Sequence, residues 1–266
     1  MVWILKFESV DILFLEYMHF ISDKFTKSIY IPLRPTFCSD FGMKRLIDLT
    51  FPVEDMSGWK RPAFLEPWTA LFELETTPIM THDKEERSCV KLSFASHSGT
   101  HIDAPRHILR EGKTIDQISL EQFIGEAIVL DFTHKKAERA ITSKDLEGTD
   151  IMPNDAVLFR TGWAEKWGTP EFYEGAPHLT LDAADYLLSK GVRAVGADFP
   201  CVDPMEELKL GQRPPIHEKL LGEGLILLEQ LANLEQITKE RVTVIALPLK
   251  IKNGDGSPAR IVAIEK

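Results

Sequence analysis

Short runs of β-branched and aromatic residues, separated by brief helical segments, fill the sequence from Met43 to its end. No Gly/Ser linker or low-complexity break interrupts this alternation, which predicts one domain over residues 43–266. The strand candidates outnumber the helices, and all of them are short and rich in strand-forming residues. They are residues 45–50, 69–75, 89–96, 127–132, 156–161, 194–198, 225–228, 242–247 and 260–264.

Three helices are marked by the residues at their ends. "SLEQFIG" begins with a serine cap, "TSKDLEG" has a threonine or serine cap and a glycine stop, and "TLDAADYLLSKG" has a broad apolar face. The last of these leads directly into the strand candidate in "VRAVGAD", a helix-then-strand unit typical of an α/β layer. The strand-rich first half suggests an antiparallel sheet beside it. The predicted fold class is therefore α/β, with a mixed or antiparallel half.

Residues 1–42 are interpreted as an N-terminal extension of uncertain structure. Their opening, "MVWILKFESVDILFLEYMHF", is apolar, but Lys6, Glu8, Asp11 and Glu16 break every window before it reaches a membrane-spanning length. We therefore expect neither a signal peptide nor a membrane anchor. An artefact of start-site choice, or an amphipathic helix that packs on a partner subunit, are the other interpretations.

The charge balance and the cysteines narrow the class of protein. The net charge of -10 comes from 41 acidic against 31 basic residues, and the longest basic cluster is "HKKAER", so a nucleic-acid partner is not expected. Cys38, Cys89 and Cys201 form no CxxC pair, which argues against a disulfide framework and a thiolate zinc site. A reducing compartment, the cytoplasm, is predicted.

The stretch "SHSGTHIDAPRH" concentrates potential metal ligands. His97, His101 and Asp103 lie within seven residues, and Gly99 and Pro105 disfavour a helix across them, so a strand end and a compact loop are expected. Imidazole and carboxylate ligands suit zinc, manganese or iron. Three such ligands are typical of a catalytic site, which keeps a coordination position open for water.

His107, at the end of the same stretch, has two candidate roles. It could be a fourth metal ligand. It could also be a general acid-base, because an imidazole titrates near neutral pH and can move a proton between water and a leaving group. The sequence by itself leaves both roles open.

A second group of candidate ligands lies in "PPIHEKLLGEGLILLEQLANL". His217 is expected just before a short helix, and Glu229 ends the apolar strand "LILLE". A carboxylate at the end of a buried strand needs a partner that offsets its desolvation, and a metal ion is one such partner. The alternative is that Glu229 begins a solvated turn and that His217 caps the helix.

Together these residues resemble the cyclase-like family of metal-dependent hydrolases, which includes bacterial-type kynurenine formamidases, isatin hydrolases and some lactone hydrolases. The family signature HxGTHxDxPxH is complete here as "HSGTHIDAPRH". The resemblance runs from about Lys44 to the C-terminus. It includes "LFRTGW", "VGADFPCVDP", "HEKLLGEGLILLEQLANLEQI" and "ALPLKIKNGDGSPARIVAI".

The resemblance implies a three-layer β/β/α domain of the swivelling type, assembled as homodimers or homotetramers. It implies one or two divalent ions per subunit, with Zn²⁺ foremost and Mn²⁺ as the alternative. By resemblance His97, His101 and Asp103 hold one ion, Asp103 and Glu229 bridge to a second, and His217 completes the second site.

The same resemblance assigns His107 as proton donor and acceptor.

The sequence departs from the family pattern at two positions. Cys201 stands where relatives commonly have a serine, which puts a hydroxyl role in doubt. Relatives of the formamidase type line the substrate pocket with a tryptophan after the first strand. Trp59 is its candidate counterpart here, although its flanking residues match poorly and a surface or interface position is the alternative.

The function implied is that of a divalent-metal hydrolase in which metal-bound hydroxide attacks an amide or formamide carbonyl. N-formylkynurenine is the expected small-molecule substrate, which would place the enzyme in tryptophan catabolism. A lactone or cyclic-imide hydrolase of the isatin type, built on the same metal core, is the first alternative. A metal-binding scaffold without catalysis is the second.

Overall fold

The computed structural model describes residues 45–54, 60, 62–71, 74–135, 140–208 and 211–265. The predicted extension over residues 1–42 and the candidate pocket residue Trp59 lie outside these described residues. The elements described below all belong to one compact unit, Phe41–Lys266.

One large mixed sheet forms the centre of this unit. Its strand order is β1-β12-β11-β5-β7-β9-β10-β4, and a further pairing of β4 with β12 closes seven of the eight strands into a barrel. Closure leaves the barrel strands without free edges. The strands are β1 (Arg45–Asp48), β4 (His101–Asp103), β5 (Ile124–Asp131), β7 (Ala156–Arg160), β9 (Ala194–Ala197), β10 (Ile226–Glu229), β11 (Arg241–Pro248) and β12 (Gly256–Glu265).

Parallel and antiparallel pairings share this sheet. Strands β5, β7, β9 and β10 pair parallel with one another in that order, whereas every pairing of β1, β4, β11 and β12 is antiparallel, including β11 with β5 and β4 with β10. The predicted α/β class with a mixed sheet is confirmed. As expected, the first-half strands β1 and β4 pair antiparallel, but their partners β10 and β12 come from the second half of the chain. The three-layer β/β/α description stays a prediction.

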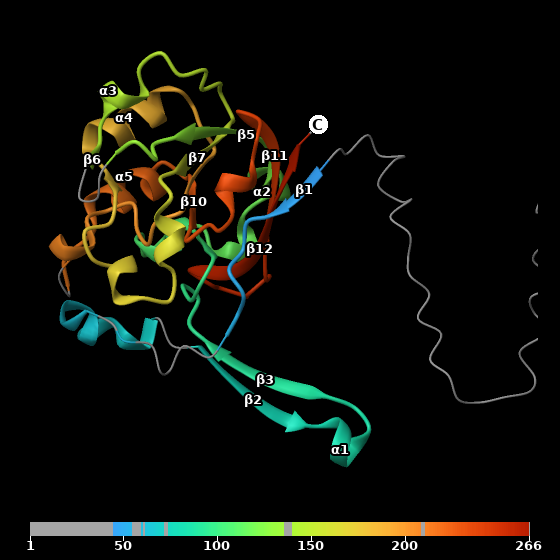
Figure 1. The fold of residues 1–266 in the computed structure, drawn as a ribbon. Helices are drawn as coiled ribbons and strands as arrows, with labels where there is room; N and C mark the ends of the chain where they lie inside the picture. Colours follow the sequence, from blue (N-terminus) through green and yellow to red (C-terminus); the bar gives the residue numbers. More distant parts are fainter. Residues whose placement is uncertain are drawn as a thin grey trace, which may run out of the picture. The chain divides into compact units, whose positions relative to one another are not determined.

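Apolar side chains line both faces of the parallel strands. Along β7, Val157 and Phe159 join one buried cluster, whereas Ala156 and Leu158 join another, because successive side chains point to opposite faces. The first cluster also takes in the helices α3 (Ser143–Leu146), α4 (Leu181–Ser189) and α5 (Pro215–Gly222). These three helices lie on one side of the sheet in Figure 1. Burial on both faces explains the nearly continuous apolar character of these strands.

A two-stranded hairpin projects from the barrel (Figure 1). It consists of β2 (Leu74–Met80) and β3 (Cys89–Phe94), with α1 (His82–Glu85) at its turn. The predicted strand over residues 69–75 is wrong, because a 3-10 helix occupies Ala63–Leu71 and β2 begins only at Leu74. Pro67, inside that helix, has no amide hydrogen to donate to a strand ladder.

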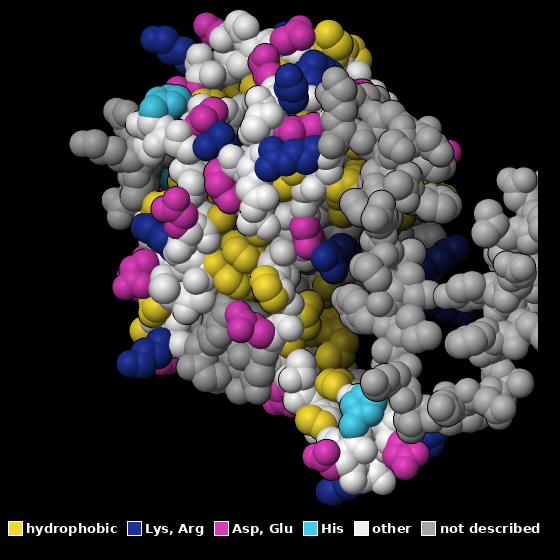
Figure 2. Space-filling view, turned by 45° about the vertical axis from the view of Figure 1, so that its right-hand side comes forward, with side chains coloured by type: hydrophobic (Ala, Val, Ile, Leu, Met, Phe, Trp, Pro, Cys, Tyr) yellow, Lys and Arg dark blue, Asp and Glu magenta, His cyan; other side chains and the backbone are white. Residues whose placement is uncertain are grey.

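The remaining elements are short. They are α2 (Leu120–Phe123), the strand pair β6 (Ala140–Ile141) and β8 (His178–Leu179), and 3-10 helices at Pro105–His107, Ile115–Gln117, Trp163–Lys166, Pro170–Phe172, Met205–Glu207 and Leu234–Gln236. On the face drawn in Figure 2, basic side chains lie scattered among acidic ones. Among the described residues, no helix combines the length and apolar character needed to cross a bilayer.

Strand β4 closes the barrel and carries the signature residues. His101 lies opposite Glu229 of β10, and Asp103 lies opposite Gly256 of β12. A β-carbon at Gly256 would lie 2.7 Å from the carbonyl oxygen of Ile102 and 2.8 Å from Cε1 of His97. Only glycine lets β12 approach β4 and the His97 ring this closely.

We expect Gly256→Ala to lower the free energy of unfolding by about 1–3 kcal/mol, because the added methyl overpacks the barrel seam. Urea unfolding followed by circular dichroism measures the change. Gly222→Ala is the matched control, because the space around Gly222 in α5 is open. Equal stability of Gly256→Ala and the parent protein would contradict the close approach of the two strands.

Asp198 is a buried carboxyl at the end of β9. It accepts hydrogen bonds from the Thr161 hydroxyl at 2.5 Å, from the Thr161 amide at 2.9 Å and from the Gly162 amide at 2.7 Å. Burial raises the pKa of Asp198 to about 6 and outweighs these hydrogen bonds, which lower it. The folded protein therefore binds a proton here at a pH where the unfolded chain has already released it.

The raised pKa of Asp198 predicts how the free energy of unfolding changes with pH. Between about pH 4 and about pH 6 only the folded state is protonated at Asp198, so this group makes the free energy of unfolding fall as pH rises. Asp198→Asn should remove that part of the slope, whereas Asp83→Asn, at an exposed position in α1, should leave it. Urea unfolding at several pH values tests this, and an unchanged slope in Asp198→Asn would contradict the assignment.

Candidate metal centre

The signature residues converge through the alternation of β4 and the turn before it. His101 and Asp103 are two residues apart on the strand and share one face, while Ile102 faces the core. Gly99 takes a φ of 64°, a left-handed conformation that glycine adopts without strain, and the turn returns His97 to the same face. His97 Nδ1 lies 2.6 Å and His101 Nε2 lies 3.2 Å from Asp103 Oδ1.

Glu229 and His217 approach Asp103 from β10 and α5. Glu229 is the last residue of β10 and is only 6% exposed, so the alternative of a solvated turn is wrong. His217 lies within the first turn of α5, and neither the expected position before the helix nor the capping alternative is observed. Its Nε2 lies 3.3 Å from Glu229 Oε1 and 3.4 Å from Asp103 Oδ2.

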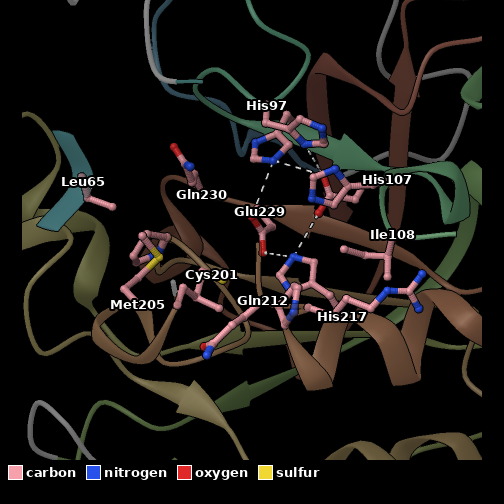
Figure 3. Close-up of a pocket in the computed structure, with 16 residues that line it drawn as sticks. Leu65, His97, His107, Ile108, Cys201, Met205, Gln212, His217, Glu229 and Gln230 are labelled. Carbon is pink, nitrogen blue, oxygen red and sulfur yellow. Dashed lines mark hydrogen bonds and ion pairs between the residues drawn. The ribbon is translucent and has the colours of Figure 1, made fainter. Parts of the chain in front are cut away.

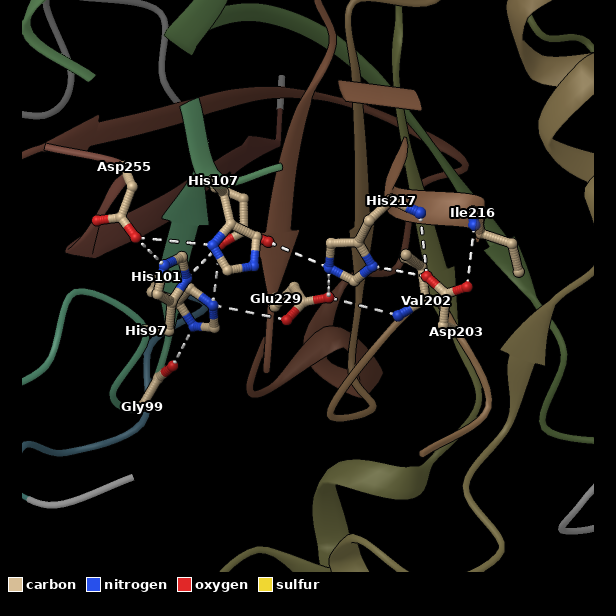
Figure 4. A network of polar contacts seen from close by, with 11 residues as sticks. His97, Gly99, His101, His107, Val202, Asp203, Ile216, His217, Glu229 and Asp255 are labelled. Atoms are coloured by element: carbon tan, nitrogen blue, oxygen red, sulfur yellow. Dashed lines mark hydrogen bonds and ion pairs between the residues drawn. The ribbon is translucent and has the colours of Figure 1, made fainter. Parts of the chain in front are cut away.

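Hydrogen bonds fix which ring nitrogen of each histidine faces the centre (Figure 4). His101 Nδ1 donates to the carbonyl oxygen of Gly99 at 2.7 Å, and His217 Nδ1 donates to Asp203 Oδ2 at 2.7 Å. Asp203 also accepts the backbone amides of Ile216 at 2.9 Å and His217 at 3.0 Å, which anchors the start of α5. In each imidazole the Nε2 lone pair is left for a cation, as in metal sites.

Asp103 is the group that all these side chains share. It is fully buried, and its Oδ2 has no hydrogen-bond donor. Although burial by itself raises the pKa of Asp103, His97, His101 and His107 hold that pKa well below its ordinary range. A buried carboxylate oxygen whose only charged contact among the described residues is His217 Nε2 at 3.4 Å favours further positive charge close by, which a divalent cation would supply.

The pKa values of His97 and His217 are also shifted by the neighbouring charged groups. Burial lowers the pKa of His97, but Asp103 and Asp255 outweigh it and raise the pKa to about 10. His217 has a pKa well above its ordinary range, because Cys201 and the surrounding carboxylates outweigh the effect of burial. The imidazoles and carboxylates together form a donor set that fits divalent metal ions.

A cavity of about 320 Å³ opens onto this cluster (Figure 3). Its apolar wall consists of Leu65, Ile108, Met205 and Leu208, and its polar lining includes His97, His101, Asp103, His107, His217 and Glu229. A largely apolar cavity with a few convergent polar groups is the usual form of a small-molecule site.

His107 lies between the two groups of ligands, with its ring centroid 4.0 Å from that of His97 and 5.8 Å from that of His217. It ends the 3-10 helix Pro105–His107, and its side chain, 27% exposed, is more accessible than those of the other cluster histidines. This position suits a group that exchanges protons with solvent and with a molecule in the cavity.

Asp255 and Asp203 are contributors that the sequence analysis missed. Asp255 Oδ2 lies 2.9 Å from His97 Nε2 and 3.6 Å from His107 Nδ1, and Asp255 Oδ1 accepts the Ser96 hydroxyl at 2.8 Å. In the sequence, Asp255 lies in "NGDGS", which reads as an ordinary turn. Asp203 has no local signal, because the helix that it anchors begins only at Pro215.

Among the residues that the structure describes, there are four overlapping groups of side chains, and within each group the donor atoms lie within 4.8 Å of one another. The structure thus brings together all six residues that the sequence predicts as ligands or proton carrier, and Trp59 lies outside the described residues. The four groups are His97 with His101 and Asp103, His97 with His107 and Asp255, Asp103 with His107 and His217, and Cys201 with His217 and Glu229.

A closed mixed sheet whose seam carries a histidine and carboxylate cluster beside a cavity is typical of a class, the α/β enzymes whose active-site side chains could hold a divalent ion. The model of the Cyclase family matches residues 47–204, and the chain belongs to this family. The family resemblance noted in the sequence is therefore confirmed.

Known relatives agree with this membership. A kynurenine formamidase of Bacillus cereus (strain ZK / E33L) is 33% identical over 220 residues, which cover 81% of this chain and 95% of that protein. Isatin hydrolase A from Labrenzia aggregata, solved with benzyl benzoate, has a TM-score of 0.75 and 26% identity over 86% of this chain and 96% of that one. A structure described as a potential metal-dependent hydrolase with cyclase activity has a TM-score of 0.66 and 28% identity over 84% of this chain and 98% of that one.

These relatives also confirm the prediction of an enzyme. The chain is a hydrolase of the cyclase family, of the class that acts on carbon–nitrogen bonds other than peptide bonds.

Asp203→Asn should weaken zinc binding by about 10- to 100-fold, because the group that orients a metal-binding imidazole is lost while the imidazole stays. Competition with a chromophoric chelator measures the affinity. Asp182→Asn is the matched control, because Asp182 also accepts a backbone amide at a helix start, that of Ser143 at 2.9 Å. Unchanged zinc affinity in Asp203→Asn would contradict the orienting role.

Proposed function

We propose that the chain is a divalent-metal hydrolase of the arylformamidase type, which cleaves the formamide of an aryl substrate such as N-formylkynurenine. The observation that carries this proposal is the position of Asp103. Its two carboxylate oxygens face two different sets of donors, and one of those oxygens is buried without a hydrogen-bond donor.

The proposed ligand sets follow from these two directions. His97, His101 and Asp103 Oδ1 form the first set, and Asp103 Oδ2, His217 and Glu229 form the second. Bound divalent ions would supply Lewis acidity, which polarises a carbonyl and lowers the pKa of water towards about 7. Zn²⁺ is the proposed ion and Mn²⁺ the alternative, because imidazole and carboxylate donors suit both.

His107 is proposed as the proton carrier. It would take a proton from the attacking water and give it to the leaving nitrogen of the formamide. Its partial exposure and its place between the two ligand sets support this role over that of a further ligand. Asp255, 3.6 Å from His107 Nδ1, supplies a negative charge that favours one orientation of the ring.

The shape of the cavity supports an aryl substrate. Leu65, Ile108 and Met205 contribute apolar lining beside the polar cluster, and the volume of about 320 Å³ is at the lower end of the range for small-molecule sites. The apolar wall would hold a ring while the amide carbon faces the histidines. The kynurenine formamidases at 33–35% identity favour an N-formyl aryl amide.

A cyclic lactam of the isatin type is the second candidate substrate. The likeness to isatin hydrolase A favours it, at a TM-score of 0.75. The two chemistries differ in their products, because a formamide releases formate, whereas a lactam opens to a single product. A lactone hydrolase and a metal-binding scaffold are further alternatives that the same assay separates. We also propose a cytoplasmic enzyme that assembles as a homodimer or homotetramer.

The decisive assay combines elemental analysis with turnover of N-formylkynurenine, isatin and an aryl lactone. We expect bound divalent metal, formate release from N-formylkynurenine and loss of activity on chelation, because a chelator removes the ion that would polarise the carbonyl. Metal-free protein that keeps full activity would contradict the proposed centre. Isatin turnover without formate release would favour the second substrate.

Two variants separate ligand from proton carrier. His101→Ala should lose metal and activity together, whereas His107→Ala should keep its metal and lose about 10²- to 10⁴-fold in kcat. His134→Ala, at an exposed position, is the control for histidine replacement. Loss of metal from His107→Ala would instead identify His107 as a ligand. Wild-type turnover in this variant would contradict both roles.

A further inference from the structure

The segment Cys201–Asp203 follows β9 and runs along the second ligand set. Each of its three residues contacts or approaches that set. Val202 donates its amide to Glu229 Oε1 at 3.3 Å, and Asp203 Oδ2 accepts from His217 Nδ1 at 2.7 Å. The Cys201 sulfur lies within 4.8 Å of a donor nitrogen of His217 and a donor oxygen of Glu229.

Cys201 is buried, with 6% of its surface exposed, and it lines the cavity (Figure 3). A thiol that coordinates a divalent cation is deprotonated by that cation. Since its sulfur lies beside a donor nitrogen of His217 and a donor oxygen of Glu229, Cys201 can lose its proton and become a metal ligand when a cation binds there.

Asp103 provides a second and independent observation. Its Oδ2 is buried without a hydrogen-bond donor and lies 3.4 Å from His217 Nε2. On this side of the cluster, Asp103 Oδ2 and Glu229 Oε1 lie 3.4 Å and 3.3 Å from the same His217 nitrogen, Nε2. Zinc takes four ligands in a tetrahedron, and the Cys201 sulfur is an additional donor beside this set.

We propose that the Cys201 thiolate is a direct ligand of the second metal ion. The sulfur–metal bond forms as the S–H bond breaks, and the proton leaves to solvent. This ligand rests on the metal centre proposed above and deepens it, because a soft thiolate donor selects zinc over manganese at this position. The sequence contains no CxxC pair that would mark Cys201 as a ligand, because the proposed ligands lie on separate segments. These ligands are Asp103, Cys201, His217 and Glu229.

Cobalt substitution tests this ligand directly. The parent protein for the test is Cys38→Ser/Cys89→Ser, which leaves Cys201 as the remaining thiol. Loading with Co²⁺ should give visible ligand-field bands and a near-ultraviolet thiolate-to-cobalt charge-transfer band. Adding Cys201→Ser should remove the charge-transfer band and keep the ligand-field bands, because the other donors still hold cobalt.

Metal selectivity gives a second measurement. Cys201→Ser should lower the affinity for zinc by at least about 10-fold, the effect expected even of outer-shell partners, and should change the affinity for manganese less. Cys201→Ala, which has no donor atom, should behave in the same way. Equal losses for both metals in the two variants would overturn the selectivity.

The outcomes separate this proposal from the proposed function. Ligand-field bands without a charge-transfer band in the parent protein would overturn the thiolate ligand and leave the metal centre intact. A charge-transfer band that survives Cys201→Ser would also overturn it. A protein that binds no cobalt at all would overturn the metal centre and the thiolate ligand together.

Discussion

The structure of the site depends on one buried carboxylate. Asp103 is fully buried in β4, the short strand that pairs with both β10 and β12 and closes the barrel. Burying a charge in this way costs free energy unless positive charge offsets it. Imidazoles of His97, His101 and His217 surround the carboxylate, and they are suited to hold cations against it. The strand that closes the barrel thus carries side chains suited to bind metal ions.

The surrounding hydrogen bonds are arranged to keep that site in one state. The carbonyl of Gly99 holds His101, and Asp203 holds His217, so both rings present the same nitrogen to the centre. Asp203 does this while it also binds two backbone amides at the start of α5, which couples the helix position to the ligand position. Such outer partners usually govern metal affinity almost as strongly as the ligands do. The glycine at position 256 lets the strands approach closely enough to complete this arrangement.

The sequence predicted the parts of this structure that local spacing determines. The stretch "SHSGTHIDAPRH" holds its ligands close together in the sequence, so they could be named from their density and the family signature, although a loop was expected where His101 and Asp103 lie on β4. The α/β class and most strands followed from runs of apolar residues, whereas β4 has only three residues and leaves no compositional signal. Asp255 joins the site only through the tertiary fold, which places it beside His97, 158 residues away in sequence, whereas Asp203 and the thiol of Cys201 join it through the packing of β9, α5 and β10.

The most direct test of this account is a crystal structure of the metal-loaded protein with anomalous diffraction data collected at the metal absorption edge. The account predicts anomalous peaks on both sides of the Asp103 carboxylate, one beside His97 and His101 and one beside His217 and Glu229. A peak on one side alone would remove the bridging role of Asp103. Occupied metal sites elsewhere, with no peak at Asp103, would contradict the central claim.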